Sequence, residues 1–170
     1  MKYERFEDLP VWRAAIELAE RVFVLTDDKN FMRKGDLSSQ LRRASVSVSN
    51  NIAEGFERGT TQELLTFLYI ARGSAGEVRS MLILTERLSA FAHLKQVVSD
   101  LKTLAEGISR QLRAWADSLQ NSPIRGHRYL NEQTKLHDEQ SQRAEAFWDD
   151  LKEKHEKRIE RLGANFGSEK

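Results

Sequence analysis

Residues 39–58 decide the fold, and they read SQLRRASVSVSNNIAEGFER. Apolar side chains recur there at steps of three and four residues, which is the spacing of one face of an α-helix. This apolar line consists of Leu37, Leu41, Ala44, Val48, Ile52 and Phe56. A polar line on the same helix consists of Gln40, Ser47, Asn51, Glu54 and Arg58. The polar line is either a solvated helix edge or a hydrogen-bonded strip between two helices, because buried polar groups need partners.

Three further blocks have the same helical period. They run from about Val11 to Leu25, from Thr60 to about Ser89, and from about Leu94 to Asn121, while the first stretch extends over Asp36–Phe56. Asp8 and Asp36 are expected to cap the first and second helices, and Thr60 with Glu63 forms a capping box for the third. Four amphipathic helices with short connections predict an all-α, antiparallel up-down four-helix bundle over residues 1–122.

Composition narrows the function classes. The chain has 170 residues and a mass of 19.6 kDa, with 27 Lys and Arg against 26 Asp and Glu, for a net charge of +1. Near-neutrality gives no general attraction to a polyanion, so any basic site must be local. The absence of cysteine excludes disulfides and thiolate metal sites. With no signal-peptide core and no membrane-length apolar run, a cytoplasmic protein without a membrane partner is expected.

Residues 123–170 form a C-terminal extension of different character. We expect a linker at 123–137, an amphipathic helix at 138–163 and a short tail at 164–170. The helix has one apolar stripe, which His155 interrupts, made of Trp148, Leu151, Ile159 and Leu162. Such a helix packs on its own bundle or forms a self-associating coil; the alternative is a helix dedicated to another protein.

Small residues interrupt the third helix at Gly73-Ser74-Ala75-Gly76. Glycine costs about 1 kcal/mol relative to alanine inside a helix, so two of them require a reason. Gly73 and Gly76 therefore predict a close approach of helices or of subunits, and a kink is the alternative. Ser74 and Glu77 are then the expected partners of the polar line on the second helix.

Arginine outnumbers lysine in the bundle region, and arginine is preferred where a planar donor meets carboxylate or phosphate. One interpretation is intramolecular pairing, with Glu54 or Glu77 as acceptors. The other is contact with nucleic-acid phosphates. The candidates for that contact are Arg42, Arg43, Arg58, Arg72 and Arg79.

Two ordered motifs then carry a family resemblance. SQLRRASVSVSNNIAEGFERGT, followed by ELLTFLYIARGSAGEVRSML, resembles the four-helix bundle proteins encoded by intervening sequences in bacterial large-subunit ribosomal RNA genes. The resemblance covers about residues 3–120. Ser49 stands where that family often has proline, which leaves the helix unbroken. The resemblance implies a barrel-like homopentamer without known catalysis. A fold relative, the accessory variability protein of diversity-generating retroelements, binds a reverse transcriptase and nucleic acid.

Three functions follow as hypotheses. The first is a non-enzymatic homo-oligomeric scaffold that contacts RNA or a ribonucleoprotein. The second is a protein-binding adaptor, for example of a mobile-element reverse transcriptase. The third is a HEPN-like ribonuclease, because Arg87 and His93 fit its Arg-x(4–6)-His spacing, although the motif is short. We expect no catalytic residue, metal, cofactor or small-molecule substrate, since Glu-x-x-His motifs and phosphate-binding glycine loops are absent from the sequence.

Overall fold

The structure is a computed structural model, and it describes residues 3–121, 140, 143–155 and 157. Four long helices are present: α1 (Pro10–Thr26), α3 (Gly35–Glu57), α4 (Thr61–Arg87) and α5 (Lys95–Gln120). Three short elements accompany them: η1 (Phe6–Asp8), α2 (Lys29–Met32) and η2 (Ser89–Leu94). The all-α prediction is confirmed.

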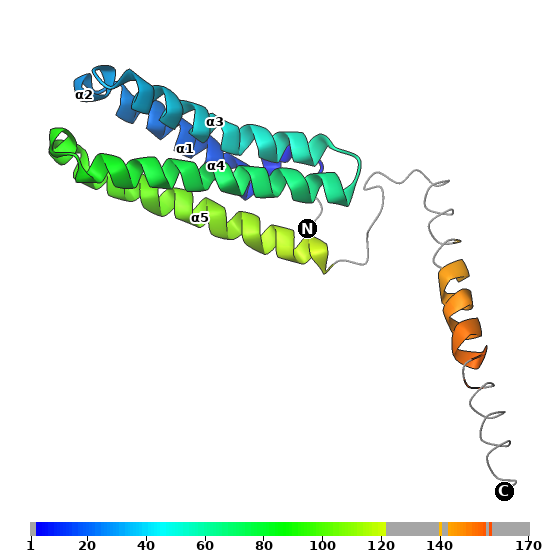
Figure 1. Cartoon of the computed structure of the whole chain (residues 1–170). Helices are drawn as coiled ribbons and strands as arrows, with labels where there is room; N and C mark the ends of the chain where they lie inside the picture. The colour runs from blue at the N-terminus through cyan, green and yellow to red at the C-terminus, as the bar shows by residue number, and fades with distance from the viewer. Residues whose placement is uncertain (1–2, 122–139, 141–142, 156, 158–170) are drawn as a thin grey trace, which may run out of the picture. The chain divides into compact units, whose positions relative to one another are not determined.

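The long helices form an antiparallel bundle. Helix α3 packs on α4, α4 on α5, and α1 closes the ring against α3 and α5. Short connections reverse the chain at each end, so α2 and η2 lie at the same end of the bundle (Figure 1). None of the helices in the described ranges is long and apolar enough to cross a membrane.

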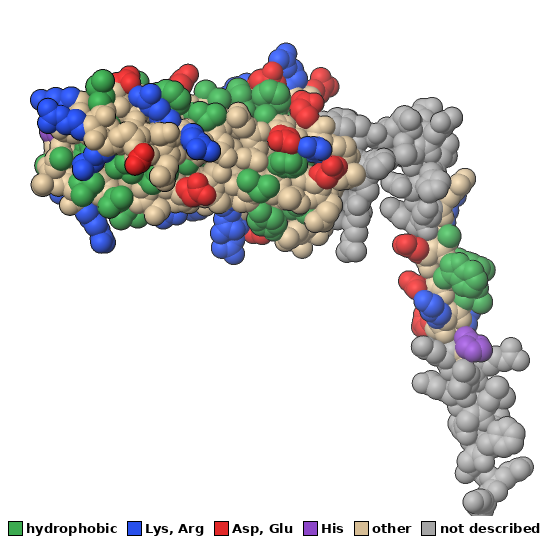
Figure 2. Space-filling view, turned by 45° about the horizontal axis from the view of Figure 1, so that its top comes forward, with side chains coloured by type: hydrophobic (Ala, Val, Ile, Leu, Met, Phe, Trp, Pro, Cys, Tyr) green, Lys and Arg blue, Asp and Glu red, His purple; other side chains and the backbone are tan. Residues whose placement is uncertain are grey.

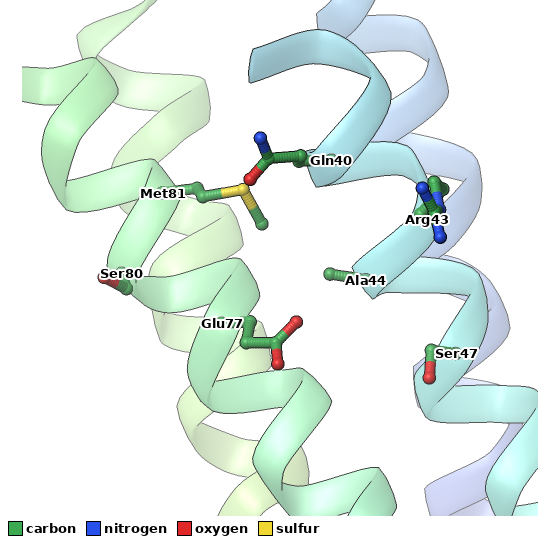
Figure 3. A pocket seen from close by; sticks show the side chains of 7 residues that line it. All are labelled: Gln40, Arg43, Ala44, Ser47, Glu77, Ser80 and Met81. Atoms are coloured by element: carbon green, nitrogen blue, oxygen red, sulfur yellow. The ribbon is translucent and has the colours of Figure 1, made fainter. Parts of the chain in front are cut away.

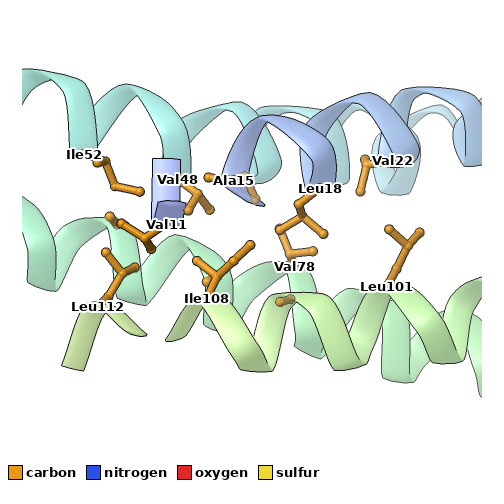
Figure 4. Packing of buried hydrophobic residues seen from close by; sticks show 14 of the residues in the cluster. Val11, Ala15, Leu18, Val22, Val48, Ile52, Val78, Leu101, Ile108 and Leu112 are labelled. Atoms are coloured by element: carbon orange, nitrogen blue, oxygen red, sulfur yellow. The ribbon is translucent and has the colours of Figure 1, made fainter. Parts of the chain in front are cut away.

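The apolar stripes meet along the bundle axis. Figure 4 shows side chains from all four long helices converging there, each at most 6% exposed. The labelled members are Val11, Ala15, Leu18, Val22, Val48, Ile52, Val78, Leu101, Ile108 and Leu112. Burial of this shared core is what stabilises helices that would be marginal alone. Trp12 and Trp115 pack against the core while staying partly exposed.

The start of α4 follows the capping prediction in part. The hydroxyl oxygen of Thr60 accepts a hydrogen bond from the backbone N–H of Glu63 at 3.2 Å, as expected. The Glu63 carboxylate accepts from the Thr60 hydroxyl at 2.8 Å, not from its backbone N–H. One orphan N–H of the first turn is therefore satisfied by a side chain.

The caps predicted at Asp8 and Asp36 are wrong. Asp8 is the last residue of η1, and the N-cap of α1 is Leu9, which precedes Pro10. Helix α3 begins one residue before Asp36, with Lys34 as its N-cap. Asp36 thus lies in the first turn, where a carboxylate is favoured by the helix dipole without capping.

The stretch TDDKN, residues 26–30, contains the start of a short helix that no apolar period in the sequence predicts. Asp28 caps α2 by accepting from the backbone N–H of Asn30 at 2.8 Å. This short helix buries Phe31, whose ring stacks on Phe91 of η2 with centroids 4.4 Å apart. The two connections at this end of the bundle are therefore packed together.

The C-terminal extension includes a described helical stretch at residues 143–155, with residues 140 and 157 also helical. This stretch lies within the predicted helix of 138–163. The linker, the tail and the ends of that helix lie outside the described residues.

Candidate functional site

The polar line of α3 meets α4 at a pair of serines. The Ser47 and Ser74 hydroxyl oxygens are 2.9 Å apart. Asn51 donates to the Ser47 hydroxyl at 3.0 Å and to its carbonyl at 2.7 Å, while the Ser74 hydroxyl donates to the carbonyl of Ile70 at 3.1 Å. Every donor is used when Ser47 donates to Ser74. The structure thus joins three of the predicted network residues, Ser47, Asn51 and Ser74, in one chain of hydrogen bonds.

A groove of about 580 Å³ lies beside this serine pair, between α3 and α4. In Figure 3, Glu77 and Met81 extend from α4 toward Gln40, Ala44 and Ser47 of α3. The full lining is Gln40, Arg43, Ala44, Ser47, Glu77, Ser80 and Met81. No histidine lines the groove, so the serine hydroxyls there have no imidazole to act as a base. The groove offers polar binding groups and no nucleophile activated in that way.

Glu54 is placed differently from the rest of the polar line. It is exposed and accepts from Arg58 at 2.6 Å one helical turn away. This hydrogen bond raises the pKa of Arg58 above its ordinary value. Glu54 and Arg58 therefore form a pair on the surface of α3 and lie outside the serine chain.

The Arg42 side chain is held by the end of α1 and its C-cap residue. Its Nε donates to the Thr26 hydroxyl at 2.6 Å, and its terminal nitrogen donates to Asp27 at 2.7 Å. The guanidinium also lies 5.0 Å from the centroid of the Phe23 ring. Three partners within one protomer make Arg42 a structural residue that joins α3 to α1.

The other predicted arginines do not gather into one patch. Arg58 pairs with Glu54 and lies 3.8 Å from Glu63, and Arg79 lies 3.9 Å from Glu106 of α5. Across the described residues, Arg43 and Arg72 take part in none of the ion pairs within 4.0 Å. Only these two of the five have a guanidinium left for an external phosphate.

Within the described residues, no other helix of the protomer packs closely against Gly73 or Gly76. The predicted close approach of helices at these two glycines is therefore wrong for the protomer. A Cβ added at either position would meet nothing within 4 Å. Both glycines are exposed on the outer face of α4, which is one continuous helix. The close approach occurs at Gly55, where an added Cβ would stand 2.7 Å from the Cβ of Phe67.

Arg87 and His93, the two residues that match the ribonuclease spacing, lie in different elements. Arg87 is the last residue of α4, and His93 lies in η2. The His93 Nε2 atom is 2.9 Å from an Asp28 carboxylate oxygen, and this hydrogen bond lowers the pKa of Asp28. Within the described ranges, no three His, Asp or Glu side chains are grouped to hold a metal ion.

Comparison with known proteins adds the family. The model of the 23S rRNA-intervening sequence proteins matches residues 7–114. The chain belongs to the 23S rRNA-intervening sequence protein family. No curated protein matches. A crystal structure of a protein of unknown function from the S23 ribosomal protein family, from Bacteroides thetaiotaomicron VPI-5482, shares 21% identity and a TM-score of 0.56. The similarity covers 62% of this chain and 97% of that one, and it supports the fold alone.

The C-terminal helix lies beyond the part of the chain that the intervening sequence protein family accounts for. Within it, Trp148 is 62% exposed and Leu151 is 41% exposed, beside Phe147 at 60%. Ile159 and Leu162, the other predicted members of its stripe, lie outside the described residues. These three large apolar side chains are thus exposed on one described helical stretch.

Sequence reasoning missed three groove residues of this intervening sequence protein: Ala44, Ser80 and Met81. A helical signal for one of them was present, because Met81 follows Ser74 by seven residues and so shares its face. Asp28 was also missed, since its role depends on a contact with His93, which is 65 residues away.

Proposed function

We propose that this protein is a non-catalytic scaffold that assembles into a homopentamer through the outer face of α4 and contacts RNA. The observation that carries the proposal is an exposed stripe along α4 that combines apolar residues, very small residues and one glutamate, and that borders the α3–α4 groove. Its members, at alternating helical steps, are Ile70, Gly73, Glu77, Ser80 and Leu84. Ile70 is 46% exposed and Leu84 is 49% exposed.

The two open glycines explain how a second copy would fit. Gly73 and Gly76 leave the α4 backbone uncovered by side chains, with Ile70 and Leu84 on either side. A neighbouring helix could approach the α4 backbone closely at the two glycines and bury the side chains of Ile70 and Leu84. Glycines in a helix cost stability in the protomer, and a subunit contact gives that cost a reason.

Two observations support an RNA contact. The family is named for an intervening sequence of 23S rRNA, and Arg43 and Arg72 are without ion-pair partners in the described part of the chain. A few phosphate contacts per protomer bind weakly, but a pentamer presents each of them five times. Effective concentration then multiplies the affinity.

A non-catalytic role is supported by the state of the two candidate chemical groups. His93 is engaged by Asp28, and no histidine is present among the lining residues of the α3–α4 groove to activate its serines. Replacing Arg87 and His93 with alanine should leave the background of RNA cleavage unchanged. A cleavage rate that falls in that variant would make the protein a ribonuclease.

Solution mass tests the assembly. The wild-type chain should elute with about five times its 19.6 kDa mass in light scattering. A double variant, Ile70→Glu with Leu84→Glu, should shift to the protomer mass because two carboxylates would enter the interface. The matched control replaces Val24 and Val97, which are exposed elsewhere, with glutamate and should retain the oligomer. A wild-type monomer, or equal loss in both variants, would refute this assembly.

An adaptor function is the second candidate, and one observation favours it. Phe147, Trp148 and Leu151 expose a large apolar surface on the C-terminal helix. Calorimetric titration against a purified retroelement reverse transcriptase tests this directly. Binding that disappears in Trp148→Ala with Leu151→Ala would favour the adaptor, whereas unchanged binding would exclude the helix as the contact.

A further inference from the structure

The cations that are left unpaired in the bundle are concentrated at the end where α2 and η2 meet. Five Lys and Arg side chains there are exposed and take part in none of the ion pairs of the described residues. They are Lys29, Arg33, Lys34, Arg87 and Lys95. We call this set, with the two connections that carry it, the basic end. In Figure 2, blue and purple side chains gather at this end of the bundle.

The acidic residues at the basic end are mostly occupied. Asp27 is ion-paired with Arg42 and Glu86 with Lys102, and Asp28 accepts a hydrogen bond from His93, which is an ion pair only when the imidazole is protonated. Asp36 is the remaining carboxylate of the two connections and their flanks. Five cations without an ion-pair partner therefore compare with two carboxylates, Asp28 and Asp36, that have no permanently charged partner.

The opposite end of the bundle has the reverse balance. Six acids lie there, in η1 with the residues before it, at the end of α3 and at the start of α4; they are Glu4, Glu7, Asp8, Glu54, Glu57 and Glu63. The arginines among them, Arg5, Arg13 and Arg58, each have a carboxylate partner. The near-zero net charge of the chain thus hides a polarity along the bundle axis.

The cations of the basic end come from two separate connections that are fixed to each other. The rings of Phe31 and Phe91 stack in the core, and the Asn30 amide donates to the carbonyl of Ala90 at 2.9 Å. The contact of Asp28 with His93 adds a third link. Because these contacts already fix the basic end, a ligand does not have to order it on binding.

We propose that the basic end is the surface on which this protein binds the phosphate backbone of a single RNA strand. This inference rests on the RNA contact proposed above. It assigns that contact to residues other than the five arginines predicted from the sequence. Backbone recognition is favoured over base recognition because the rings of the two connections, Phe31 and Phe91, are buried, and the exposed ring of nearby Phe23 already has the Arg42 guanidinium 5.0 Å from its centroid.

An anionic membrane is a poorer fit to the same charges. Membrane-surface helices combine basic residues with a broad apolar face containing Trp, Phe or Leu. Near the basic end the exposed large apolar side chains are Phe23, Val24, Met32, Ile83, Leu84 and Val97. They are divided among α1, α2, α4 and α5 and include one aromatic ring, so they do not form the single broad face of a membrane-surface helix.

Fluorescence anisotropy of the full-length chain with a labelled single-stranded RNA of about 20 nucleotides, over about 50–200 mM salt, tests the assignment. The variant carries Arg33→Gln, Lys34→Gln, Arg87→Gln and Lys95→Gln. A plot of log affinity against log salt has a negative slope. Each lost phosphate contact should make that slope shallower by about 0.7, so four should make it shallower by roughly 3. Affinity should fall at least about tenfold in low salt.

The matched control removes the same charge from elsewhere: Arg5→Gln, Arg13→Gln, Arg58→Gln and Arg113→Gln. It should keep the wild-type slope. Equal losses in the two variants, or none in the first, would overturn the basic end while leaving the RNA contact in place. No binding by the wild type even in low salt would remove the RNA contact itself, and with it this site.

Two further measurements complete the design. Circular dichroism checks that each variant is folded; if the quadruple variant is not, Arg33→Gln with Lys34→Gln alone should make the slope shallower by about half as much. Sedimentation with phosphatidylserine vesicles supplies the competing surface. Vesicle binding that depends on the basic end, together with RNA binding that does not, would replace RNA by a membrane as its ligand.

Discussion

Replacing Gly55 with alanine tests the tightest contact between α3 and α4. The added Cβ would stand 2.7 Å from the Cβ of Phe67 and 3.2 Å from Cδ1 of Leu64. Non-bonded carbon atoms prefer about 3.5–4.0 Å. The Phe67 Cβ is attached directly to the backbone and cannot rotate away, so the two helices must separate locally by roughly 1 Å.

Two opposing terms set the size of the effect. Overpacking of this kind costs about 1–3 kcal/mol, while alanine gains about 0.5–1 kcal/mol over glycine in a helix. Gly107→Ala in α5 is the matched control, because an added Cβ there would meet nothing within 4 Å. The control keeps the helical gain and lacks the contact. The difference in unfolding free energy between the two variants should therefore be about 1–3 kcal/mol, with Gly55→Ala the less stable.

Urea unfolding followed by far-UV circular dichroism measures that difference. Both variants are compared at one protein concentration, so that any contribution from association is the same. A Gly55→Ala protein as stable as Gly107→Ala would mean that α3 and α4 do not approach each other at Gly55. The reasoning that assigns the close packing to this glycine, and not to Gly73 or Gly76, would then fail.

Three more predictions use the same unfolding assay. Thr60→Ala should lose about 1 kcal/mol because the N-cap of α4 is removed, whereas Thr60→Ser should retain it. Arg42→Lys should cost about 1 kcal/mol through loss of its fork of hydrogen bonds, and Arg43→Lys should change stability by less than about 0.5 kcal/mol; equal effects would contradict the pairing of Arg42. In Asp28→Asn the unfolding free energy should fall less steeply as the pH is lowered, that is, along the acid limb of the stability curve. The reason is that the hydrogen bond from His93, followed by that from Asn30, lowers the pKa of Asp28 below its ordinary 3.8. Its stabilisation is present above that value and is lost as pH falls toward the lowered pKa, so an unchanged acid limb would contradict the contact.

The fold was predictable because it depends on repeated local signals. Apolar residues at helical spacing located all four long helices, and each start or end was placed within about two residues, the usual precision of such boundaries. The helix that was missed, α2, is four residues long and has no period to detect. Its start depends on the Asp28 cap, which the sequence TDDKN offers at several equally plausible positions.

The candidate site was less predictable, and Gly73 shows why. Glycine in a helix indicates a close approach but not the partner that approaches. Gly55 faces α4, whereas Gly73 and Gly76 face away from the protomer, and that difference depends on how each helix is rotated in the bundle. Ser47, Asn51 and Ser74 could be paired in advance because the polar line of α3 runs beside the apolar line, so it borders the helix on which that apolar line packs.

Charge follows a related rule, which explains why most of the unpaired cations lie at the basic end. On a long helix an arginine has positions one turn away on the same face, and carboxylates there neutralise it, as at Arg21 with Glu17 and Arg110 with Glu106. Connections of a few residues have no such positions. Lys34 and Lys95 border connections of that kind, so their charges are compensated only if another element supplies an acid. A bundle with balanced composition can therefore keep most of its uncompensated charge at its ends, with cations at one end and acids at the other, which is why the proposed RNA contact is assigned to the basic end and not to every reversal of the chain.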